Sequence, residues 1–151
     1  PGMVVGIHVA AAEGAPMRGV STVECRADFG LVGDRCAKKG AKGQITVVSE
    51  EQLAAAGERL GRPIPPGATR RNVTVRGVEL PGAGGRLRLG GVEVEIVQPA
   101  TPCNLMNECI GPGAKDALEG LAGVRGRILS GGTLCVGDLA EAVPVGQGTL
   151  A

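Results

Sequence analysis

Short apolar segments separated by glycine and proline dominate the chain. An apolar run covers residues 3–10, and residues 20–28 alternate apolar with polar side chains, as in a strand with one buried face. Residues 43–48 form a third segment, which is rich in β-branched side chains and begins at a glycine. Each of these patterns predicts a β-strand.

The residues after this third segment predict a helix. Ser49 and Gln52 have the spacing of a capping box, in which each side chain bonds to the backbone N–H of the other residue. Alanines with high helix propensity follow at residues 54–56. Gly61 is placed to end the helix, and the prolines beyond it cannot continue one.

The second half of the chain again favours β structure. Gly90-Gly91 is a two-residue hairpin signal between two apolar segments. A loop rich in proline, asparagine and glycine is expected over residues 98–113, and a short helix over residues 114–121. Strands are predicted over residues 72–76, 87–89, 92–97, 125–129, 133–136 and 139–145.

Together these elements indicate a mostly β fold, a barrel or sandwich with a few short helices. A doubly wound α/β sheet would need helices that alternate with the strands, and only two helices are predicted. A barrel would also remove the exposed sheet edges. Because the sequence shows neither a repeat nor a long polar linker, we expect a single domain over residues 1–151.

Composition and charge limit the classes of protein to which this chain can belong. The formal charge is +1 and Phe29 is the single aromatic residue, so neither electrostatic attraction nor base stacking favours nucleic-acid binding. The apolar segments are too short for a membrane helix. The five cysteines are odd in number and widely spread, which predicts free thiols in a reducing compartment and a cytoplasmic protein.

Cys103 is the strongest candidate for chemistry. It follows Pro102 in a loop after a predicted strand, where nearby arginines would favour its thiolate. A nucleophile, a sulfur carrier and a soft metal ligand are all compatible with this position, and an inert thiol is the alternative. Cys36 and Cys109 lie in predicted loops and are candidate resolving thiols. Cys25 and Cys135 fall in predicted strands, where a core role is expected.

Other polar residues could bind an anion. Arg70, Arg71 and Asn72 stand together just before a predicted strand, where they could meet a phosphate or carboxylate, or remain ordinary surface residues. Asp34 and Arg35 lie in a glycine-bounded loop, in which the carboxylate can cap backbone amides or pair with an arginine. The lone histidine, His8, is expected to be a strand residue with a satisfied hydrogen bond.

In order along the chain, these segments resemble the MOSC family, named for the C-terminal domain of molybdenum cofactor sulfurase. The resemblance implies a barrel-like, mostly β fold with a cleft. The matching segments are residues 30–35, 43–51, 66–67, 70–75 with Gly77, Gly90 before a strand, Pro102-Cys103, residues 125–132 and residues 136–138.

The resemblance also assigns roles. It implies that Cys103 carries sulfur as a persulfide or contacts the molybdenum of the pterin cofactor (molybdopterin). It maps the polar residues of the family's cleft onto Asp34, Arg35, Arg70, Arg71 and Asn72. One departure is Cys36, at a position where relatives often have histidine or an aromatic residue.

Three hypotheses of function remain. In the leading one, Cys103 takes sulfur from a cysteine desulfurase and passes it to a molybdoenzyme or a cofactor-biosynthesis protein, in a sulfurtransferase-like role. In the second, the protein binds or delivers the molybdenum cofactor without covalent chemistry. In the third, it is a small cysteine-dependent enzyme that acts on sulfur-containing small molecules.

Overall fold

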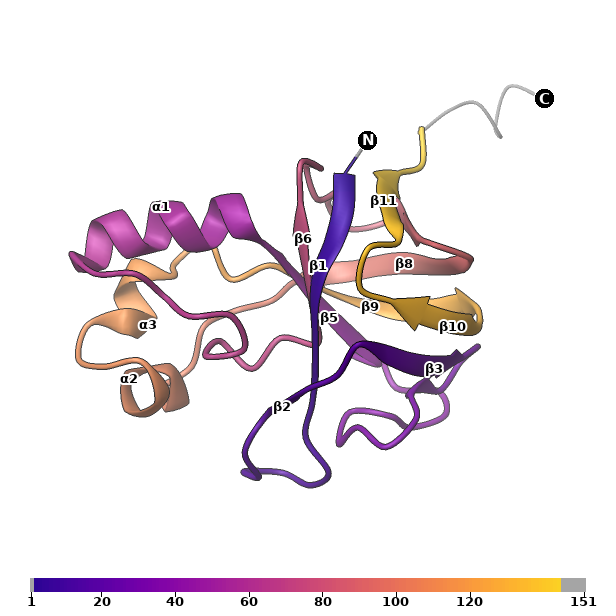
Figure 1. The fold of residues 1–151 in the computed structure, drawn as a ribbon, viewed down its shortest axis with the longest axis horizontal. Helices are drawn as coiled ribbons and strands as arrows, with labels where there is room; N and C mark the ends of the chain where they lie inside the picture. Colours follow the sequence, from indigo (N-terminus) through magenta and orange to yellow (C-terminus); the bar gives the residue numbers. More distant parts are fainter. Residues whose placement is uncertain (1, 145–151) are drawn as a thin grey trace.

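A closed β-barrel forms the centre of the molecule. The computed structural model describes residues 2–144, and in this range seven strands close in the order β1, β6, β5, β9, β8, β7, β11 and back to β1 (Figure 1). The pair β5 and β6 is parallel, and the other pairs around the barrel are antiparallel. The predicted mostly β, barrel-like fold is confirmed.

The barrel strands match the segments expected from the sequence. Predicted and observed ends differ by at most a few residues, except that Val145, the end predicted for the last strand, lies outside the described residues. The barrel strands are β1 (Gly2–Val9), β5 (Ile45–Ser49), β6 (Val73–Arg76), β7 (Arg86–Leu89), β8 (Val92–Pro99), β9 (Val124–Ser130) and β11 (Leu139–Ala142).

A smaller three-stranded sheet lies beside the barrel. It has the order β10 (Gly132–Cys135), β3 (Thr22–Arg26), β4 (Gly30–Leu31), with antiparallel pairing throughout. A further two-residue strand, β2 (Arg18–Gly19), pairs with the end of β1. The predicted strands over residues 20–28 and 133–136 therefore belong to this second sheet and not to the barrel.

The first helix, α1 (Glu50–Leu60), connects the two parallel strands. Parallel neighbours need a crossover connection, and α1 with the loop after it supplies one. The predicted capping box is confirmed, because Ser49 and Gln52 bond reciprocally, at 3.0 and 3.1 Å. Gly61 ends the helix in the left-handed conformation, with φ +84°. The limits of α1 follow from these local signals.

Two shorter helices complete the helical layer, which lies to one side of the barrel (Figure 1). The predicted loop over residues 98–113 was wrong in part, because α2 (Leu105–Cys109) forms inside it and places Cys109 on a helix. The residue before it, Asn104, is of a type that often caps helices, but its side chain makes no capping hydrogen bond here. The third helix, α3 (Ala114–Ala117), is shorter than predicted, and Gly120 with φ +76° follows its last turn.

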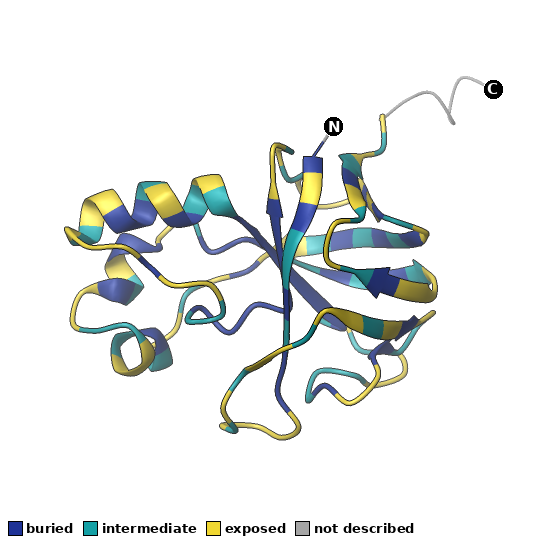
Figure 2. Cartoon of the chain, in the orientation of Figure 1, coloured by how far each residue is buried: buried dark blue, intermediate teal, exposed yellow. Residues whose placement is uncertain are grey.

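The buried apolar residues form two separate hydrophobic cores. The barrel interior takes alternate residues of its strands, such as Val92, Val94 and Ile96 of β8, while Glu93 and Glu95 between them stay partly exposed (Figure 2). The second core lies between the helices and the outer face of β5. Its buried members are Val48, Leu53, Ala56, Ile64, Met106, Ala114, Leu118 and Ala122. Within residues 2–144, no helix is both long and apolar enough to cross a bilayer.

Candidate functional site

The predicted site residues converge where several barrel strands begin or end. On one side of β5, β6 begins and β1 ends, because Val73 pairs with both Val47 and Ile7. On its other side β9 begins and β8 ends at the same level, because Val124 pairs with both Val47 and Pro99. Thr46 of β5 stands opposite Arg125 of β9, and Pro99 of β8 stands opposite Val124. The loops that carry Asp34, Arg71 and Cys103 meet through two arginines, because Arg35 donates to the backbone oxygen of Arg70 and Arg71 donates to that of Thr101.

Arg71 lies at the centre of this region. Its Nε donates to the backbone oxygen of Ala122 at 2.8 Å, and its Nη2 donates to that of Thr101 at 3.1 Å. These bonds orient a guanidinium that is almost wholly buried. They use two of its five N–H groups and leave the Nη1 group free for a ligand.

The charge around Arg71 is predominantly positive. Burial, followed by repulsion from Arg125, lowers the pKa of Arg71 to about 10, and Arg35 acts in the same direction. Cys103 and Cys36 instead raise the pKa of Arg71. We call this group of five residues, Arg35, Arg71, Arg125, Cys36 and Cys103, the arginine site.

Arg125 was not predicted as a site residue. Its side chain lies beside Gly43, where a Cβ would be in ordinary van der Waals contact with Nη1, at 3.5 Å. In residues 2–144, Arg125 has no ion pair with a carboxylate. The sequence predicted its strand, but its position near Arg71 depends on the pairing of β9 with β5, which no local pattern reveals.

Asp34 is fixed by hydrogen bonds within the protein. One carboxylate oxygen accepts from the backbone N–H of Ala10 at 3.0 Å, and the other accepts from that of Cys36 at 3.1 Å. Arg35 lies 3.6 Å from the same carboxylate and donates to the backbone oxygen of Arg70 at 3.2 Å. Asp34 therefore caps backbone amides, which was one of the two roles predicted for it, and these bonds fix the turn that carries Arg35 and Cys36.

Asn72 is likewise engaged within the protein. Its Oδ1 accepts from the backbone and the hydroxyl of Thr46, and its Nδ2 donates to the backbone oxygen of His8. It is fully buried. These bonds join the starts of β5 and β6 to the end of β1, and a cofactor contact by Asn72 stays a prediction.

Arg70 has two unusual features. Its backbone is in the left-handed region, with φ +63°, which is uncommon for a residue with a side chain. Its residue is 9% exposed, and its Nη2 is buried without a hydrogen-bond partner in the described part of the chain. Buried donors are normally paired, so an unpaired guanidinium nitrogen here is what an anionic ligand would satisfy.

The MOSC domain family model matches residues 34–141 of this chain. The chain belongs to the MOSC family. The match covers most of the sequence, from the Asp34 turn to the last barrel strand, and it contains all the predicted site residues. The family is associated in general with molybdenum-cofactor and sulfur-related functions. The family resemblance seen in the sequence is thereby confirmed.

Solved structures share the fold of this MOSC domain. The YUAD protein from Bacillus subtilis superposes with a TM-score of 0.77 at 19% identity, over 93% of this chain and 94% of that one. YiiM from Geobacillus stearothermophilus gives 0.74 at 24% identity, over 98% and 78%. YiiM from Escherichia coli gives 0.68 at 17% identity, over 95% and 71%. Comparison with curated proteins found no match.

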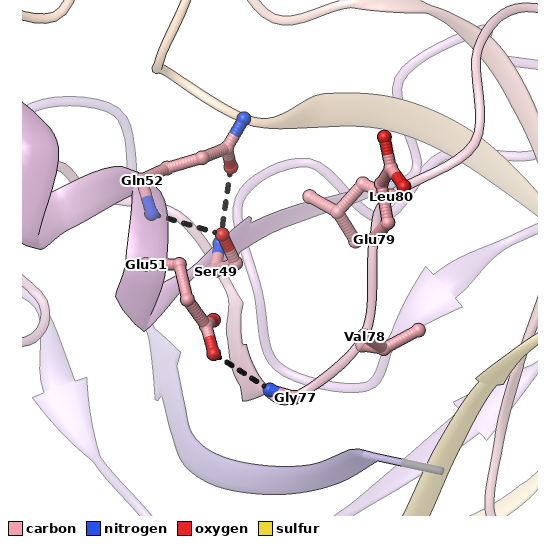
Figure 3. Close-up of a pocket in the computed structure, with 7 residues that line it drawn as sticks. All are labelled: Ser49, Glu51, Gln52, Gly77, Val78, Glu79 and Leu80. Atoms are coloured by element: carbon pink, nitrogen blue, oxygen red, sulfur yellow. Dashed lines mark hydrogen bonds between the residues drawn. The ribbon is translucent and has the colours of Figure 1, made fainter.

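A separate cavity of about 490 Å³ lies where the parallel strands β5 and β6 end, whereas Arg71 lies just before the start of β6 (Figure 3). Several of its polar groups are already paired. Ser49 and Gln52 form the capping box, and a carboxylate oxygen of Glu51 accepts from the backbone N–H of Gly77 at 2.9 Å. This cavity therefore offers less for chemistry than the arginine site does.

His8 lies outside the arginine site. Its backbone bonds to Asn72, but its ring packs against Gly67, where a Cβ would come within 2.7 Å of the ring. The predicted hydrogen bond is missing from Nδ1, which is buried without a partner among residues 2–144. Burial lowers the pKa of His8, which favours a neutral ring.

Proposed function

We propose that this MOSC domain carries sulfur on Cys103 and binds an anionic, phosphate-bearing group of the molybdenum-cofactor type at the arginine site. The observation that carries the proposal is that the exposed thiol of Cys103 lies in the loop to which the buried Arg71 guanidinium is bonded, through the backbone oxygen of Thr101 at 3.1 Å. A thiolate is the reactive form of cysteine, and an exposed loop leaves the thiol accessible to a donor.

The residues fit a phosphate-bearing cofactor. Arg71 keeps a free Nη1 group, Arg125 lacks a carboxylate partner in the described chain, and Arg70 has an unpaired buried Nη2. Guanidinium groups are well suited to phosphate oxygens, so these residues would hold the anionic part of the cofactor. When bound, the cofactor would supply a metal centre able to accept or use sulfur.

A metal would need ligands from outside the protein. Among residues 2–144, no group of three or more histidine, cysteine, aspartate or glutamate side chains is arranged to hold a metal ion. Cys103 by itself offers one sulfur ligand. A molybdenum contact by Cys103 is therefore consistent only with a metal that arrives already held in an organic cofactor.

The sulfur-transfer step is a thiol exchange. The Cys103 thiolate attacks the terminal sulfur of a persulfide on a donor such as a cysteine desulfurase. The S–S bond of the donor breaks, the donor cysteine leaves as a thiolate, and a new S–S bond forms on Cys103. No added oxidant is needed, because one S–S bond forms as another breaks and the terminal sulfur keeps its oxidation state. An acceptor, a molybdoenzyme or a cofactor-biosynthesis protein, would then take the sulfur.

A cytoplasmic location accords with this role. All five cysteines are free thiols, as expected in a reducing compartment. Cys103 and Cys109 are exposed, and a persulfide carrier needs an accessible thiol.

Mass spectrometry tests the carrier role. The intact protein is incubated with a cysteine desulfurase and cysteine, desalted and mapped by peptide. We expect a gain of one sulfur atom on Cys103 and none in Cys103→Ser. Cys109→Ser is the matched control, since it removes another exposed thiol and should still load. Sulfur loading that is unchanged in Cys103→Ser would falsify the proposal.

Non-covalent cofactor binding is the second candidate, and the unpaired Nη2 of Arg70 favours it. It predicts that the protein retains molybdenum cofactor on gel filtration even as Cys103→Ser, and that Arg71→Gln releases it. A loss of binding in Cys103→Ser would instead favour a role for the thiol in holding the cofactor.

A further inference from the structure

Lysine is concentrated in one short loop of this chain. The sequence has four lysines, and three of them, Lys38, Lys39 and Lys42, fall within residues 38–43, between β4 and β5. All three are exposed, and within residues 2–144 none of them forms an ion pair. We call residues 38–43 the lysine loop. Because the whole chain has a net charge of only +1, the loop is a local concentration of positive charge.

Hydrogen bonds from a buried side chain fix this loop against the barrel. The fully buried Gln44 donates from Nε2 to the backbone oxygen of Lys38 at 3.2 Å and to the carboxylate of Asp28 at 3.0 Å. Its Oε1 accepts from the backbone N–H of Ile128 in β9 at 3.1 Å. Asp28 also accepts from the backbone N–H of Gly40 at 3.2 Å. The backbone of the lysine loop is therefore held in place while its lysine side chains stay exposed.

The carboxylate that anchors the loop does not cancel its charge. The hydrogen bond from Gln44 lowers the pKa of Asp28, and the charge of Arg127 lowers it further. Arg127 follows Arg125 by two residues on the same face of β9, and neither forms an ion pair in the described chain. Glu95 of β8 stands opposite Arg127 without pairing with it. The lysine loop and the start of β9 together therefore have an excess of positive charge.

The lysine loop lies beside the arginine site. A Cβ on Gly43 would contact Nη1 and Cδ of Arg125 at 3.5 and 3.6 Å, so the end of the loop lies against this side chain. Arg125 stands opposite Thr46 of β5 on one side and opposite Gln98 of β8 on the other. The chain that leaves β8 carries Cys103. Arg125 thus lies between the lysine loop and the segment that leads to the thiol.

A single interface can cover both the lysine loop and Cys103. Arg71 donates to the backbone oxygen of Thr101 at 3.1 Å, and Cys103 follows two residues later, so the thiol stays close to the arginine site. Its Cα is at most about 18 Å from that of Gln98, five residues earlier. A protein interface of standard size buries about 800 Å² on each partner, a patch about 30 Å wide. A protein seated on the lysine loop therefore reaches the loop that carries Cys103.

Exposed lysines fit a protein partner better than a small anion. A lysine ammonium is a compact, strongly hydrated charge on a flexible stem, and it offers no fixed pair of donors. Small phosphates are held best by guanidinium groups, which Arg70 and Arg71 already supply. Charged side chains at the rim of an interface instead steer a partner of opposite charge and raise its rate of association. The lysine loop therefore fits an acidic protein surface.

We propose that the lysine loop is the docking surface for the protein that donates sulfur to Cys103, and that this donor carries acidic side chains around its persulfide. This role rests on the proposed function, because Cys103 must take its sulfur from a protein persulfide. The two partners of the site thus meet two kinds of cation. Buried arginines hold the anionic cofactor, and exposed lysines guide the protein donor.

The test uses a cysteine desulfurase with cysteine and follows the gain of sulfur on Cys103 by peptide mass spectrometry. Between about 20 and 300 mM NaCl, we expect the wild-type rate at low protein concentration to fall about tenfold, because salt screens the attraction. The lysine-loop variant combines Lys38→Gln, Lys39→Gln and Lys42→Gln. At low salt it should load about tenfold more slowly, through a higher KM at unchanged kcat of the desulfurase, and with little salt dependence.

Two controls separate docking from chemistry. Arg86→Gln, Arg88→Gln and Lys115→Gln together remove three positive charges from β7 and α3, and this control variant should load as the wild type does. Cysteine persulfide is a small donor that needs no docking surface. It should therefore load Cys103 in the wild type and in the lysine-loop variant at the same rate.

The outcomes separate the docking surface from the carrier role. Loading of the lysine-loop variant by the desulfurase at the wild-type rate, or equal slowing of the control variant, overturns the docking surface and leaves the carrier role intact. Slower loading by cysteine persulfide in the lysine-loop variant also overturns it, because the substitutions would then act on the thiol. A wild type that gains no sulfur on Cys103 from either donor overturns the carrier role, and the docking surface with it.

Binding to other polyanions is tested with the same variants. A single-stranded RNA and vesicles containing phosphatidylserine are the probes, at about 0.15 M NaCl, where exposed charges are already well screened. We expect neither probe to retain the wild type. Retention of the wild type but not of the lysine-loop variant would assign the loop to a phosphate-bearing surface and overturn the assignment to an acidic protein.

Discussion

The amide oxygen of Asn72 accepts hydrogen bonds from both the backbone N–H and the hydroxyl of Thr46, at 3.0 and 3.2 Å. The same residue returns a bond from its own backbone N–H to that hydroxyl at 2.9 Å. Two neighbouring parallel strands are thus joined at the position where the arginine site begins. The site is built on a rigid support, although its reactive groups lie on loops.

The first prediction concerns this support. Asn72→Ala removes a buried amide that bonds to Thr46 and His8, and leaves their backbone groups unpaired. We expect the free energy of unfolding to fall by about 3 kcal/mol, measured by urea denaturation. Thr46→Val keeps the bond from its own backbone N–H but removes both bonds of the hydroxyl and leaves the Asn72 backbone N–H unpaired, so it should lose about 2 kcal/mol. An Asn72→Ala protein as stable as the wild type would contradict this role.

The second prediction concerns two left-handed glycines near the start of β9. Gly123 has φ +87°, and a Cβ there would lie within 2.1 Å of the backbone oxygen of Val47. Gly120 has φ +76° but open space around it. Gly120→Ala should therefore lower the free energy of unfolding by about 1 kcal/mol, which is the conformational penalty alone.

Gly123→Ala has both this penalty and the backbone clash. We expect it to prevent folding or to lower the melting temperature far more than Gly120→Ala does, as measured by circular dichroism. Equal melting temperatures for the two variants would show that the close approach of Gly123 to β5 does not matter.

The third prediction uses the charge of Arg71. Its folded-state pKa, about 10, lies well below the ordinary value for arginine because burial disfavours the charged form. The contribution of this group to stability is therefore fully present above the ordinary pKa and is lost as the pH falls through about 10. At neutral pH the buried charge is destabilising, and a bound anion should offset this effect.

We thus expect inorganic phosphate at pH 7 to raise the melting temperature of the wild type by a few degrees. Arg71→Gln should lose this gain. Arg88→Gln, which removes an exposed arginine paired with Glu141, should keep it. The gain should shrink above pH 10. A phosphate effect that is the same in all three proteins would reflect a general salt effect and not the arginine site.

The fourth prediction concerns thiol reactivity. Burial, with a smaller effect of Glu24, raises the pKa of Cys25 to about 12, and its side chain is almost inaccessible. Iodoacetamide at pH 8 should therefore modify the exposed Cys103 and Cys109 in the native protein and leave Cys25 intact until denaturant is added. Peptide mass spectrometry measures the rates. Early labelling of Cys25 would show that its strand opens.

Local signals explain which parts of the fold the sequence revealed. The limits of α1 follow from Ser49, Gln52 and Gly61, all within one segment, and the hairpin turn follows from Gly90-Gly91. The helix α2 was not predicted because it has only five residues, its N-cap residue Asn104 makes no side-chain capping bond, and its buried Met106 packs in the second core. Such a helix depends on packing that the sequence does not display.

The site was predictable in part for the same reason. Cys103 and the Arg70-Arg71 pair stand out by residue type and by their position next to predicted strands. Arg125 does not, because its role depends on the register that places it opposite Thr46. The engagement of Asn72 with Thr46 and His8 also depends on tertiary pairing, so the sequence alone could not separate a supporting amide from a ligand contact.

The barrel closes where Met3 of β1 pairs with Leu139 of β11. This contact joins segments from near the two ends of the described chain, so the first strand has no permanent partner on that side until β11 has emerged from the ribosome. The β1 edge is therefore exposed to other nascent chains throughout synthesis. A chaperone that shields this edge would shorten the period in which the protein is most prone to aggregation.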